Sequence, residues 1–350
     1  MNVNGKRYRT VWFKDGTVYL INQTLLPFEF HVHEARNHRD TCTAITTMIV
    51  RGAPAIGAAA GFAMAQAFLE APNEAFHTYL ANAKKEIESA RPTGQNLFYA
   101  VRRVYDYALK QSNPRAAAVT EAQRIADEDV EHCRKIGEFG NELMDDGFKV
   151  LTHCNAGWLA CVDYGTALSS IYVAHQSGKK VFVYVGETRP RSQGAKLTAW
   201  ELKNEHIPYC IFADNAGAYI MKKEKVDLVI VGADRIARNG DVANKIGTLE
   251  KAIVAKELEI PFYVAAPTST CDLSCESGSV IPIEYRSEGE VIYQTGFNKE
   301  KQLETITVYP EDFRVTNPAF DVTPASYIRG IITENGIVKP EEVGGLSLNT

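Results

Sequence analysis

Residues Lys149–Cys154, with the sequence KVLTHC, mark a change from a helical pattern to an alternating α/β pattern. From Asp40 to about Met144 the chain is mostly helical in its periodicity, with Ala-rich amphipathic segments. After Lys149, short runs rich in β-branched residues follow one another, and the first of them runs into a His-Cys-Asn turn. The pattern therefore places the thiol of Cys154 at the end of a predicted strand.

Five apolar runs alternate with helical segments in this second part of the chain. They are KVLTHC (149–154), KVFVYVGE (180–187), YCIFAD (209–214), VDLVIVGAD (226–234) and PFYVAAP (261–267). The segments 165–178, 195–206 and 244–259, which lie between them, read as helices. Strands that are apolar throughout and alternate with helices are typical of a parallel sheet covered on both faces. We therefore expect an α/β protein with a doubly wound, Rossmann-like and mostly parallel sheet.

The first part of the chain is expected to form a domain of its own. The segment RTVWFKDGTVYLIN (9–22) reads as a small β-hairpin that turns at Asp15-Gly16. The helical pattern follows this hairpin. The sequence thus predicts a mainly helical N-terminal domain over residues 1–130 and a Rossmann-like catalytic domain over 131–350.

Composition limits the kinds of partner. The 350-residue chain is 45% hydrophobic and 23% charged, with a net charge of -5 and no block of Lys or Arg. This mild acidity argues against nucleic acid or an anionic membrane and favours a small molecule. The N-terminus lacks the apolar core of a secretory signal, and no segment is long and apolar enough for a membrane span, so we expect a cytoplasmic protein.

The cysteines predict neither a disulfide framework nor a metal site. There are seven of them, scattered along the chain, so we expect reduced thiols that are mostly buried. Cys271 and Cys275 form the only close pair, and no second Cys/His pair accompanies them. Nucleotide-binding patterns of the G-x-x-x-x-G-K-[ST] or G-x-G-x-x-G type are also missing, so no cofactor is expected.

Polar residues stand at the ends of the predicted strands, where ligands bind in open α/β sheets. These ends are His153-Cys154-Asn155, Glu187-Thr188-Arg189, Asp214-Asn215 and Asp234-Arg235. A thiol from Cys154 and a carboxylate from Asp234 could thus meet over one crevice. Cys154 as a core thiol and Asp234 as a turn residue remain open alternatives.

Two further segments suit an anion. Asn244 and Lys245 are expected at a helix N-terminus, where backbone N–H groups, the helix dipole and an ammonium act together. Arg51 and Gly52 precede Pro54, which is expected in the first turn of another helix. Close packing between helices explains such Ala- and Gly-rich helix starts equally well.

Five motifs together resemble the methylthioribose-1-phosphate isomerases. They are RGAPAIG (51–57), RPTGQNL (91–97), THCNAGWLA (152–160), GADRIARNGDVANKIGT (232–248) and FDVTPASYI (320–328), spread over nearly the whole chain. The resemblance implies an aldose-ketose isomerase of methionine salvage, a route of amino-acid biosynthesis. Its substrate would be the sugar phosphate 5-methylthioribose 1-phosphate and its product 5-methylthioribulose 1-phosphate. It further implies a homodimer without metal or cofactor.

The resemblance also assigns roles to individual residues. Cys154 of T-H-C-N and Asp234 of G-A-D-R would be the catalytic pair. Substrate would be bound by the remaining matched positions, namely Arg51, Gly52, Ala53, Arg91, Gln193, Asn244 and Lys245. The assignments of Arg91 and Gln193 depend on the resemblance alone.

The chemistry of an aldose 1-phosphate explains why such residues are needed. Its C1 oxygen carries phosphate, so the ring cannot open to an aldehyde without an acid. Asp234 suits this role if burial raises the pKa of its carboxyl. Cys154 would then act either as the base that carries a proton between C2 and C1, or as support for a direct hydride shift.

Neighbouring residues receive structural interpretations. Cys161 and Asp241 are separated by the same spacing as Cys154 and Asp234. However, Asp241 lies in an NGD turn, and Cys161 is expected to enter a helix as a core residue. His153 is expected to be structural, because adjacent strand residues face opposite sides.

Alternative functions remain open at this stage. Gly94, Gln95 and Cys271 depart from residues common in the family and could border the 5-substituent of the sugar. The first alternative is therefore a 5-deoxyribose-1-phosphate isomerase. The less favoured alternatives are a ribose-1,5-bisphosphate isomerase and a noncatalytic regulatory subunit. The second of these resembles the family's relatives in translation initiation. Cys154 together with Asp234 favours an enzyme.

Overall fold

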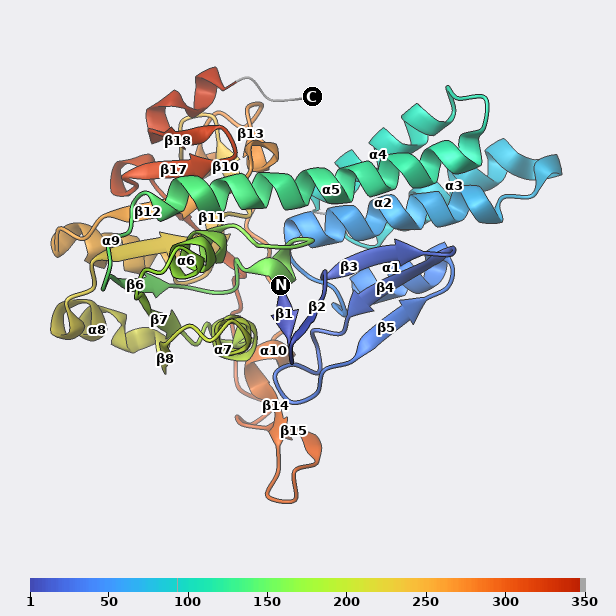
Figure 1. The fold of residues 1–350 in the computed structure, drawn as a ribbon. Coiled ribbons are helices and arrows are strands. Elements are labelled where there is room, and N and C mark those ends of the chain that lie inside the picture. The colour runs from blue at the N-terminus through green and yellow to red at the C-terminus, as the bar shows by residue number, and fades with distance from the viewer. Residues whose placement is uncertain (93, 347–350) are drawn as a thin grey trace. The chain divides into compact units, whose positions relative to one another are not determined.

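The computed structural model describes residues 1–92 and 94–346 and divides into two units (Figure 1). One, the helical unit, consists of Met1–Arg134 with Ala156–Leu168. The other, the sheet unit, consists of Lys135–Asn155 with Ser169–Thr350. The division at residues 130 and 131 stays a prediction.

The helical unit contains the predicted hairpin and helices. Its helices are α1 (His38–Thr46), α2 (Ala53–Glu70), α3 (Phe76–Ser89), α4 (Gln95–Ala108) and most of α5 (Pro114–Asn141). Its strands are β1 (Asn2–Val3), β2 (Lys6–Arg7), β3 (Val11–Lys14), β4 (Thr17–Ile21) and β5 (Val32–Ala35). Asp15 and Gly16 join β3 to β4 with positive φ angles of 51° and 82°. Two positive angles at these positions are typical of a two-residue hairpin turn.

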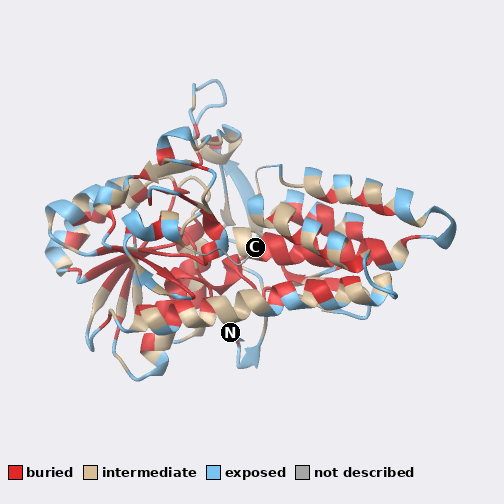
Figure 2. Cartoon of the chain, turned by 90° about the horizontal axis from the view of Figure 1, so that it is seen from above, coloured by how far each residue is buried: buried red, intermediate tan, exposed pale blue. Residues whose placement is uncertain are grey.

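Helix α2 forms the centre of this unit. Every residue from Ala55 to Phe68 is buried, as expected for a helix that is apolar on all sides (Figure 2). Its small residues allow α4 to approach closely, since a Cβ added at Gly57 would lie 3.1 Å from the Cβ of Asn96. Gly and Ala are thus needed here for packing.

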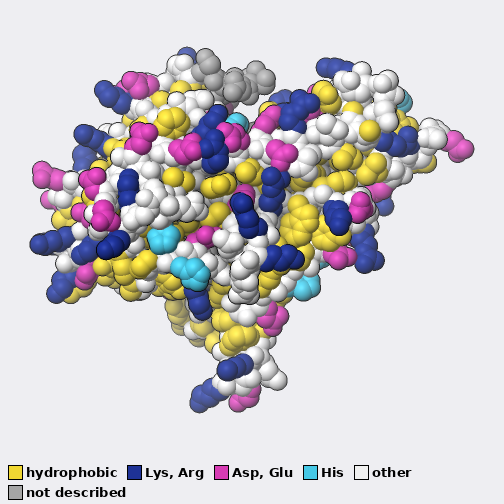
Figure 3. Space-filling view, in the orientation of Figure 1, with side chains coloured by type: hydrophobic (Ala, Val, Ile, Leu, Met, Phe, Trp, Pro, Cys, Tyr) yellow, Lys and Arg dark blue, Asp and Glu magenta, His cyan; other side chains and the backbone are white. Residues whose placement is uncertain are grey.

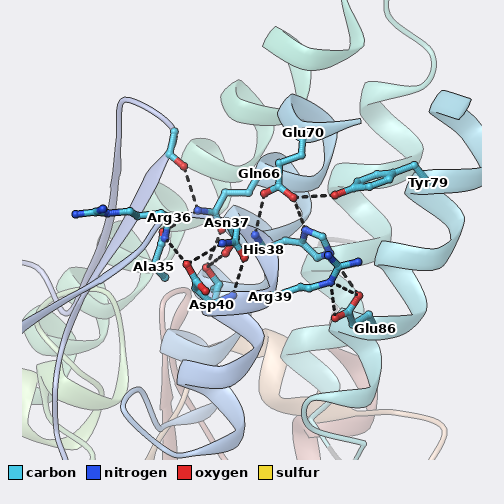
Figure 4. Close-up of polar contacts among 12 residues, drawn as sticks. Ala35, Arg36, Asn37, His38, Arg39, Asp40, Gln66, Glu70, Tyr79 and Glu86 are labelled. Carbon is cyan, nitrogen blue, oxygen red and sulfur yellow. Dashed lines mark hydrogen bonds and ion pairs between the residues drawn. The ribbon is translucent and has the colours of Figure 1, made fainter. Parts of the chain in front are cut away.

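A polar cluster connects α1, α2 and α3 within the helical unit (Figure 4). Glu70 at the end of α2 accepts hydrogen bonds from the backbone N–H of His38 at 2.9 Å and from the Tyr79 hydroxyl at 2.9 Å. The His38 ring, which is 1% exposed, lies with Nδ1 2.5 Å from the second Glu70 oxygen. Burial raises the pKa of Glu70, but the bonds from His38 and Tyr79 outweigh burial and hold this pKa below its ordinary value.

The sheet unit contains a seven-stranded sheet in the order β18-β17-β12-β9-β6-β7-β8. All neighbours are parallel except β17 and β18. The strands are β6 (Lys149–Thr152), β7 (Phe182–Gly186), β8 (Tyr209–Phe212), β9 (Leu228–Val231), β12 (Phe262–Ala265), β17 (Gly330–Thr333) and β18 (Gly336–Val338). Read by position in the chain, the six parallel strands follow the Rossmann order 3-2-1-4-5-6. The predicted doubly wound α/β fold is confirmed.

Helices join and cover these strands. They are α6 (Ala167–Gln176), α7 (Ala199–Asn204), α8 (Gly217–Glu224), α9 (Thr248–Glu257) and the short α10 (Gly289–Ile292). Apolar residues of α8 and α9, including Met221 and Ala252, share one core with strand residues such as Val229. The final turns of α5 pack on α6, where a Cβ at Gly140 would lie 1.9 Å from the Ser170 hydroxyl oxygen.

A second, four-stranded sheet in the order β13-β10-β11-β16 was not expected from the sequence. Its strands are β10 (Arg235–Ala237), β11 (Val242–Lys245), β13 (Cys271–Asp272) and β16 (Phe320–Thr323). A separate hairpin is formed by β14 (Tyr293–Phe297) and β15 (Leu303–Thr307). The chain enters this small sheet shortly after the carboxyl end of β9, because β10 begins four residues after β9 ends.

The seven cysteines all lie within the described chain, and none of them forms a disulfide there. Six are buried, as expected, and Cys210 is exposed. No helix in the described ranges is long and apolar enough to cross a membrane. On the face shown in Figure 3, Lys and Arg side chains are interspersed with Asp and Glu.

The cluster around Glu70 generates a prediction about stability. Glu70→Gln removes the charge that accepts three hydrogen bonds, so the free energy of unfolding at pH 7 should fall by about 1–3 kcal/mol. The pKa of Glu70 is lowered in the folded state, so its contribution is present above the unfolded value of about 4.3 and is lost as the pH falls through the folded value. Urea denaturation at a series of pH values measures this difference.

The matched control is Glu74→Gln, since Glu74 is exposed. Its midpoint should stay near that of the unmodified chain at every pH. The free energy of unfolding of Glu70→Gln should approach that of the unmodified chain as the pH falls below the folded pKa of Glu70. A difference that stayed constant would show that the ionised carboxylate is not its cause.

Candidate active site

The candidate site lies where the direction of the sheet reverses. The chain passes from β6 outward to β7 and β8, and then returns to β9, β12 and β17 on the other side of β6. Because β6 and β9 are neighbours whose connections leave in opposite directions, their carboxyl ends frame the crevice in which such sheets bind ligands. Cys154 follows the end of β6 by two residues, and Asp234 follows the end of β9 by three.

Cys154 has a left-handed backbone with a φ of 62°, which is uncommon outside glycine. Its N–H donates to Oγ1 of Thr188 at 2.8 Å, and its carbonyl accepts from Oγ1 of Thr198 at 2.7 Å. The residue is 7% exposed. A non-glycine residue in this region costs on the order of 1–3 kcal/mol, and such conformations are concentrated at functional sites.

Thr188 is itself held in a left-handed conformation, with a φ of 65°. The backbone N–H groups of Thr188 and Arg189 donate to the two carboxylate oxygens of Asp214 at 2.8 and 2.7 Å. The strand-end residue Asp214 therefore orders the β7 loop. Gly194 allows this loop to close, because a Cβ there would lie 1.8 Å from the carbonyl oxygen of Gly186.

His153 connects the end of β6 to the end of β11. Its Nε2 lies 2.8 Å from the carbonyl oxygen of Ile246, and its Nδ1 lies 3.4 Å from the Thr188 hydroxyl. Burial and the nearby Lys251 charge lower the pKa of the imidazole to about 4, so it is neutral at pH 7 and donates from Nε2 to Ile246. This geometry agrees with the structural interpretation of His153.

Asp234 begins the small sheet, and its backbone N–H donates to the carbonyl of Ala243 at 2.9 Å. Because Arg235 pairs with Ala243, Asp234 stands beside Asn244 of the neighbouring strand. Its side chain is exposed. The surrounding chain thus does not bury this carboxyl, contrary to what the sequence analysis expected of an acid.

Asn244 and Lys245 do not begin a helix, so that prediction is wrong. They end strand β11, and α9 begins three residues later at Thr248. The carboxylate of Asp321 already accepts from the N–H groups of Gly247 and Leu249 at 2.7 and 3.1 Å, at the start of α9. Burial raises the pKa of Asp321 to about 6. This helix end is therefore capped by a residue of the FDVTP motif.

Lys245 instead borders a hollow of about 190 Å³ in the sheet unit. The lining residues are Pro190, Arg191, Gln193, Lys245, Ile246, Arg286, Glu290, Asn317 and Ala319. The Lys245 ammonium lies 4.3 Å and the Arg286 guanidinium carbon 5.6 Å from the centre of the Phe320 ring. Oε1 of Gln193, a side chain that is 7% exposed, has no hydrogen-bond partner among the described residues.

The charges around this hollow favour an anion. Three cationic side chains and one carboxylate, that of Glu290, line it. Glu290 is bound by Arg191 at 2.9 Å and by Asn317 at 3.3 Å, and Arg286 is bound by Glu284 at 3.2 Å.

Of the residues that line the hollow, Gln193 and Lys245 were expected from the sequence as substrate-binding residues, whereas Arg286 and Asn317 were not. Arg286 and Asn317 lie outside the named helices and strands, well beyond the end of β11 in the chain, and no local motif signals them.

The remaining predicted residues belong to the helical unit. Arg51 precedes Gly52, which caps the N-terminus of α2 with a φ of 92°, and Ala53 is the first residue of that helix. A Cβ at Gly52 would lie 2.3 Å from the carbonyl oxygen of Ala160, so the position requires glycine. The predicted helix start with Pro54 in its first turn is confirmed. Arg91 lies in the connection between α3 and α4.

These features define a doubly wound α/β protein with a thiol and a carboxylate at the reversal point of its sheet and a cationic hollow beside them. A model of the Initiation factor 2 subunit family matches residues 49–340. The chain belongs to this family.

Several relatives are known by activity or by structure. The chain is 49% identical to the methylthioribose-1-phosphate isomerase of Acetivibrio thermocellus, over 93% of this chain and 95% of the relative. It is 47% identical to that of Caldanaerobacter subterraneus, over 96% and 97%.

Two solved structures are similar over most of their length. The 5-methylthioribose 1-phosphate isomerase of Pyrococcus horikoshii has a TM-score of 0.87 and 43% identity, with coverage of 97% of this chain and 95% of that one. The translation initiation factor eIF-2B, subunit delta, of A. fulgidus has a TM-score of 0.84 and 41% identity, with coverage of 96% and 97%.

The cationic hollow generates a prediction about anion binding. Lys245→Ala removes a buried ammonium, so the Kd for inorganic phosphate should rise by about 10- to 100-fold, the usual effect of losing a hydrogen bond to a charged group. Lys256→Ala, at a lysine of α9 that does not line the hollow, should leave the Kd unchanged. Isothermal titration calorimetry measures both. Equal phosphate affinity in the two variants would place the anion elsewhere.

Proposed function

We propose that this chain converts 5-methylthioribose 1-phosphate into 5-methylthioribulose 1-phosphate, the aldose-ketose step of methionine salvage. The observation that carries this proposal is the position of Cys154 and Asp234 after adjacent strands at the reversal point of the sheet. The names of relatives at 46–49% identity support it. We place the reaction in the cytoplasm and the enzyme in a homodimer, as the family resemblance implies.

Asp234 is the proposed acid. Opening the ring of an aldose 1-phosphate requires a proton at the ring oxygen, because the phosphate ester blocks spontaneous opening. Asp234 is exposed, so the desolvation that favours a protonated carboxyl would have to come from the sugar itself as it covers the residue. The rigid pairing of Asp234 with β11 holds the residue in position meanwhile.

Cys154 is the proposed partner in the transfer of hydrogen from C2 to C1. As a thiolate it would carry a proton through a cis-enediol-like intermediate; alternatively, it would support a hydride passing directly to a cation-like C1. The hydroxyls of Thr188 and Thr198 fix its backbone, which places the sulfur reproducibly against the reacting carbons.

Phosphate binding holds the sugar while these carbons react. Gln193, Asn244 and Lys245 of the sheet unit are proposed to contact the substrate, and Lys245 brings a cation to the hollow. Arg51, Gly52, Ala53 and Arg91 are also proposed as substrate-binding residues, as the family resemblance implies. Binding energy spent on the nonreacting phosphate positions the reacting atoms.

A 5-deoxyribose-1-phosphate isomerase is the second candidate, since the departures at Gly94, Gln95 and Cys271 still allow a different 5-substituent. A noncatalytic role is the third, because a similar structure is described as an initiation-factor subunit. The decisive experiment offers the purified chain 5-methylthioribose 1-phosphate and 5-deoxyribose 1-phosphate and follows ketose formation. A higher kcat/KM for the methylthio sugar supports the proposal. Binding of both sugars without turnover would refute an isomerase.

Asp234→Asn tests the acid. The variant should fold normally and retain affinity for the sugar phosphate while kcat falls about 10²–10⁴-fold, the usual contribution of one positioned acid or base. Steady-state kinetics with a binding measurement separates the two effects. A variant with kcat within a few-fold of the unmodified chain would remove Asp234 from the mechanism.

Asp241→Asn is the control, because Asp241 serves the backbone. Its carboxylate accepts from the N–H groups of Gly278 and Ala325, each at 2.9 Å. Burial raises the pKa of Asp241, but these bonds and one from Asn239 lower it below its ordinary value. This variant should lose stability more than rate.

Cys154→Ala tests the thiol. It should fold and scarcely react, whereas a packing residue would tolerate the change with a modest loss of stability. In the unmodified chain, alkylation of Cys154 by iodoacetamide should be slowed by substrate or product, because a bound phosphate dianion disfavours the thiolate. Peptide mapping is needed, since Cys210 is exposed and will also react. Full activity in Cys154→Ala would make the residue a packing cysteine.

The same reaction run in deuterated water separates the two roles of Cys154. Deuterium at C1 of the ketose indicates a proton carried by the thiolate, provided that exchange with solvent is not slower than transfer. A ketose without label favours the hydride shift.

A further inference from the structure

The helical unit contains three clustered side chains that the proposed reaction does not use. One oxygen of Asp129 and the sulfurs of Cys133 and Cys161 all lie within 4.8 Å of one another. Asp129 and Cys133 are four residues apart on α5 and so share a face of that helix. Cys161 follows the short 3₁₀ helix Trp158–Ala160, rather than entering a helix as the sequence had suggested.

The carboxylate of Asp129 is held in a fixed orientation. Its Oδ2 accepts the backbone N–H of Val162 at 2.6 Å, and its Oδ1 lies 3.9 Å from the sulfur of Cys133. One oxygen therefore anchors the loop to α5 while the other is turned toward the thiols. Carboxylates that bind metals are commonly oriented in this way by a second hydrogen bond.

The two thiols of the cluster are buried, and Asp129 is partly buried. Cys133 and Cys161 are 0% and 1% exposed. Among the described residues Asp129 makes no ion pair; Arg9, whose charge also reaches Asp129, binds Asp127 at 2.7 Å.

We propose that Asp129, Cys133 and Cys161 form a binding site for a thiophilic divalent cation of the zinc class. Two thiolates and one carboxylate suit such an ion, whereas magnesium and calcium require oxygen ligands throughout. Three protein ligands leave a fourth position for water. The ion would displace the thiol protons into solution. It would also link α5 to the loop that contains Cys161.

A disulfide between Cys133 and Cys161 is the competing explanation. It would need an external two-electron oxidant, and it would use only two of the three clustered side chains. A cation uses all three side chains. The three-residue geometry therefore favours the metal site.

The test is a titration of the full-length reduced chain, first stripped of metal by a chelator, with Cd²⁺ alone. Binding should produce one equivalent of sulfur-to-cadmium charge-transfer absorption in the ultraviolet, release of protons into weak buffer, and a rise in Tm. Zn²⁺ should compete for the same equivalent. Cys133→Ser and Cys161→Ser should each weaken binding by at least about 10- to 100-fold, and Asp129→Asn by a similar factor.

Two cysteine variants outside the cluster provide controls. Cys42→Ser, at a buried thiol of the same unit, and Cys210→Ser, at the exposed thiol, should retain the full equivalent. Circular dichroism establishes that each variant is folded, and X-ray absorption of the unmodified chain with Zn²⁺ should count two sulfur neighbours without any mutation.

Three results would overturn the proposal. The first is the lack of saturable binding by the unmodified chain. The second is binding that is lost in Cys210→Ser but kept in Cys133→Ser. The third is a reduced chain that binds no cation but forms a Cys133–Cys161 disulfide with oxidised glutathione, which would make the cluster a redox pair.

Discussion

The candidate site depends on two threonine hydroxyls that hold the backbone of Cys154 in a left-handed conformation. Thr188 accepts the N–H of Cys154 and Thr198 donates to its carbonyl, so the loop after β7 and the helical segment beyond it fix the end of β6. Thr188 also has a positive φ, and its backbone N–H donates to Asp214, which follows the end of β8. The ends of three strands are thereby locked together before any ligand is considered, which preorganises the sulfur.

Carboxylates at this edge of the sheet unit divide into two kinds. Asp214, Asp241 and Asp321 each accept two backbone N–H groups and so order loops or a helix end. Asp234 is held by its own backbone N–H, and its carboxyl is exposed. Asp234 therefore differs from the other three in its exposure.

The same architecture occurs in proteins described as an isomerase and as an initiation-factor subunit, at 43% and 41% identity to this chain. Overall similarity therefore cannot decide between catalysis and binding, because function resides in particular side chains placed on a fold. Here a thiol with a left-handed backbone and an acidic residue follow two adjacent strands of the sheet, and this arrangement favours catalysis.

The sequence by itself determined the fold class, five of the seven strands of the large sheet, the hairpin at Asp15-Gly16 and the helix start at Gly52. These features follow from local periodicity and turn chemistry. Burial by distant segments decided the rest. Asn244 and Lys245 read as a helix start because a helix does begin nearby, but pairing with β10 and β16 extends their strand to Lys245. Three features required the tertiary structure: Asp234 is exposed, Arg286 and Lys245 line the same hollow, and Cys133 lies close to Cys161. The residues concerned are far apart in the chain, so no local sequence pattern indicates these features.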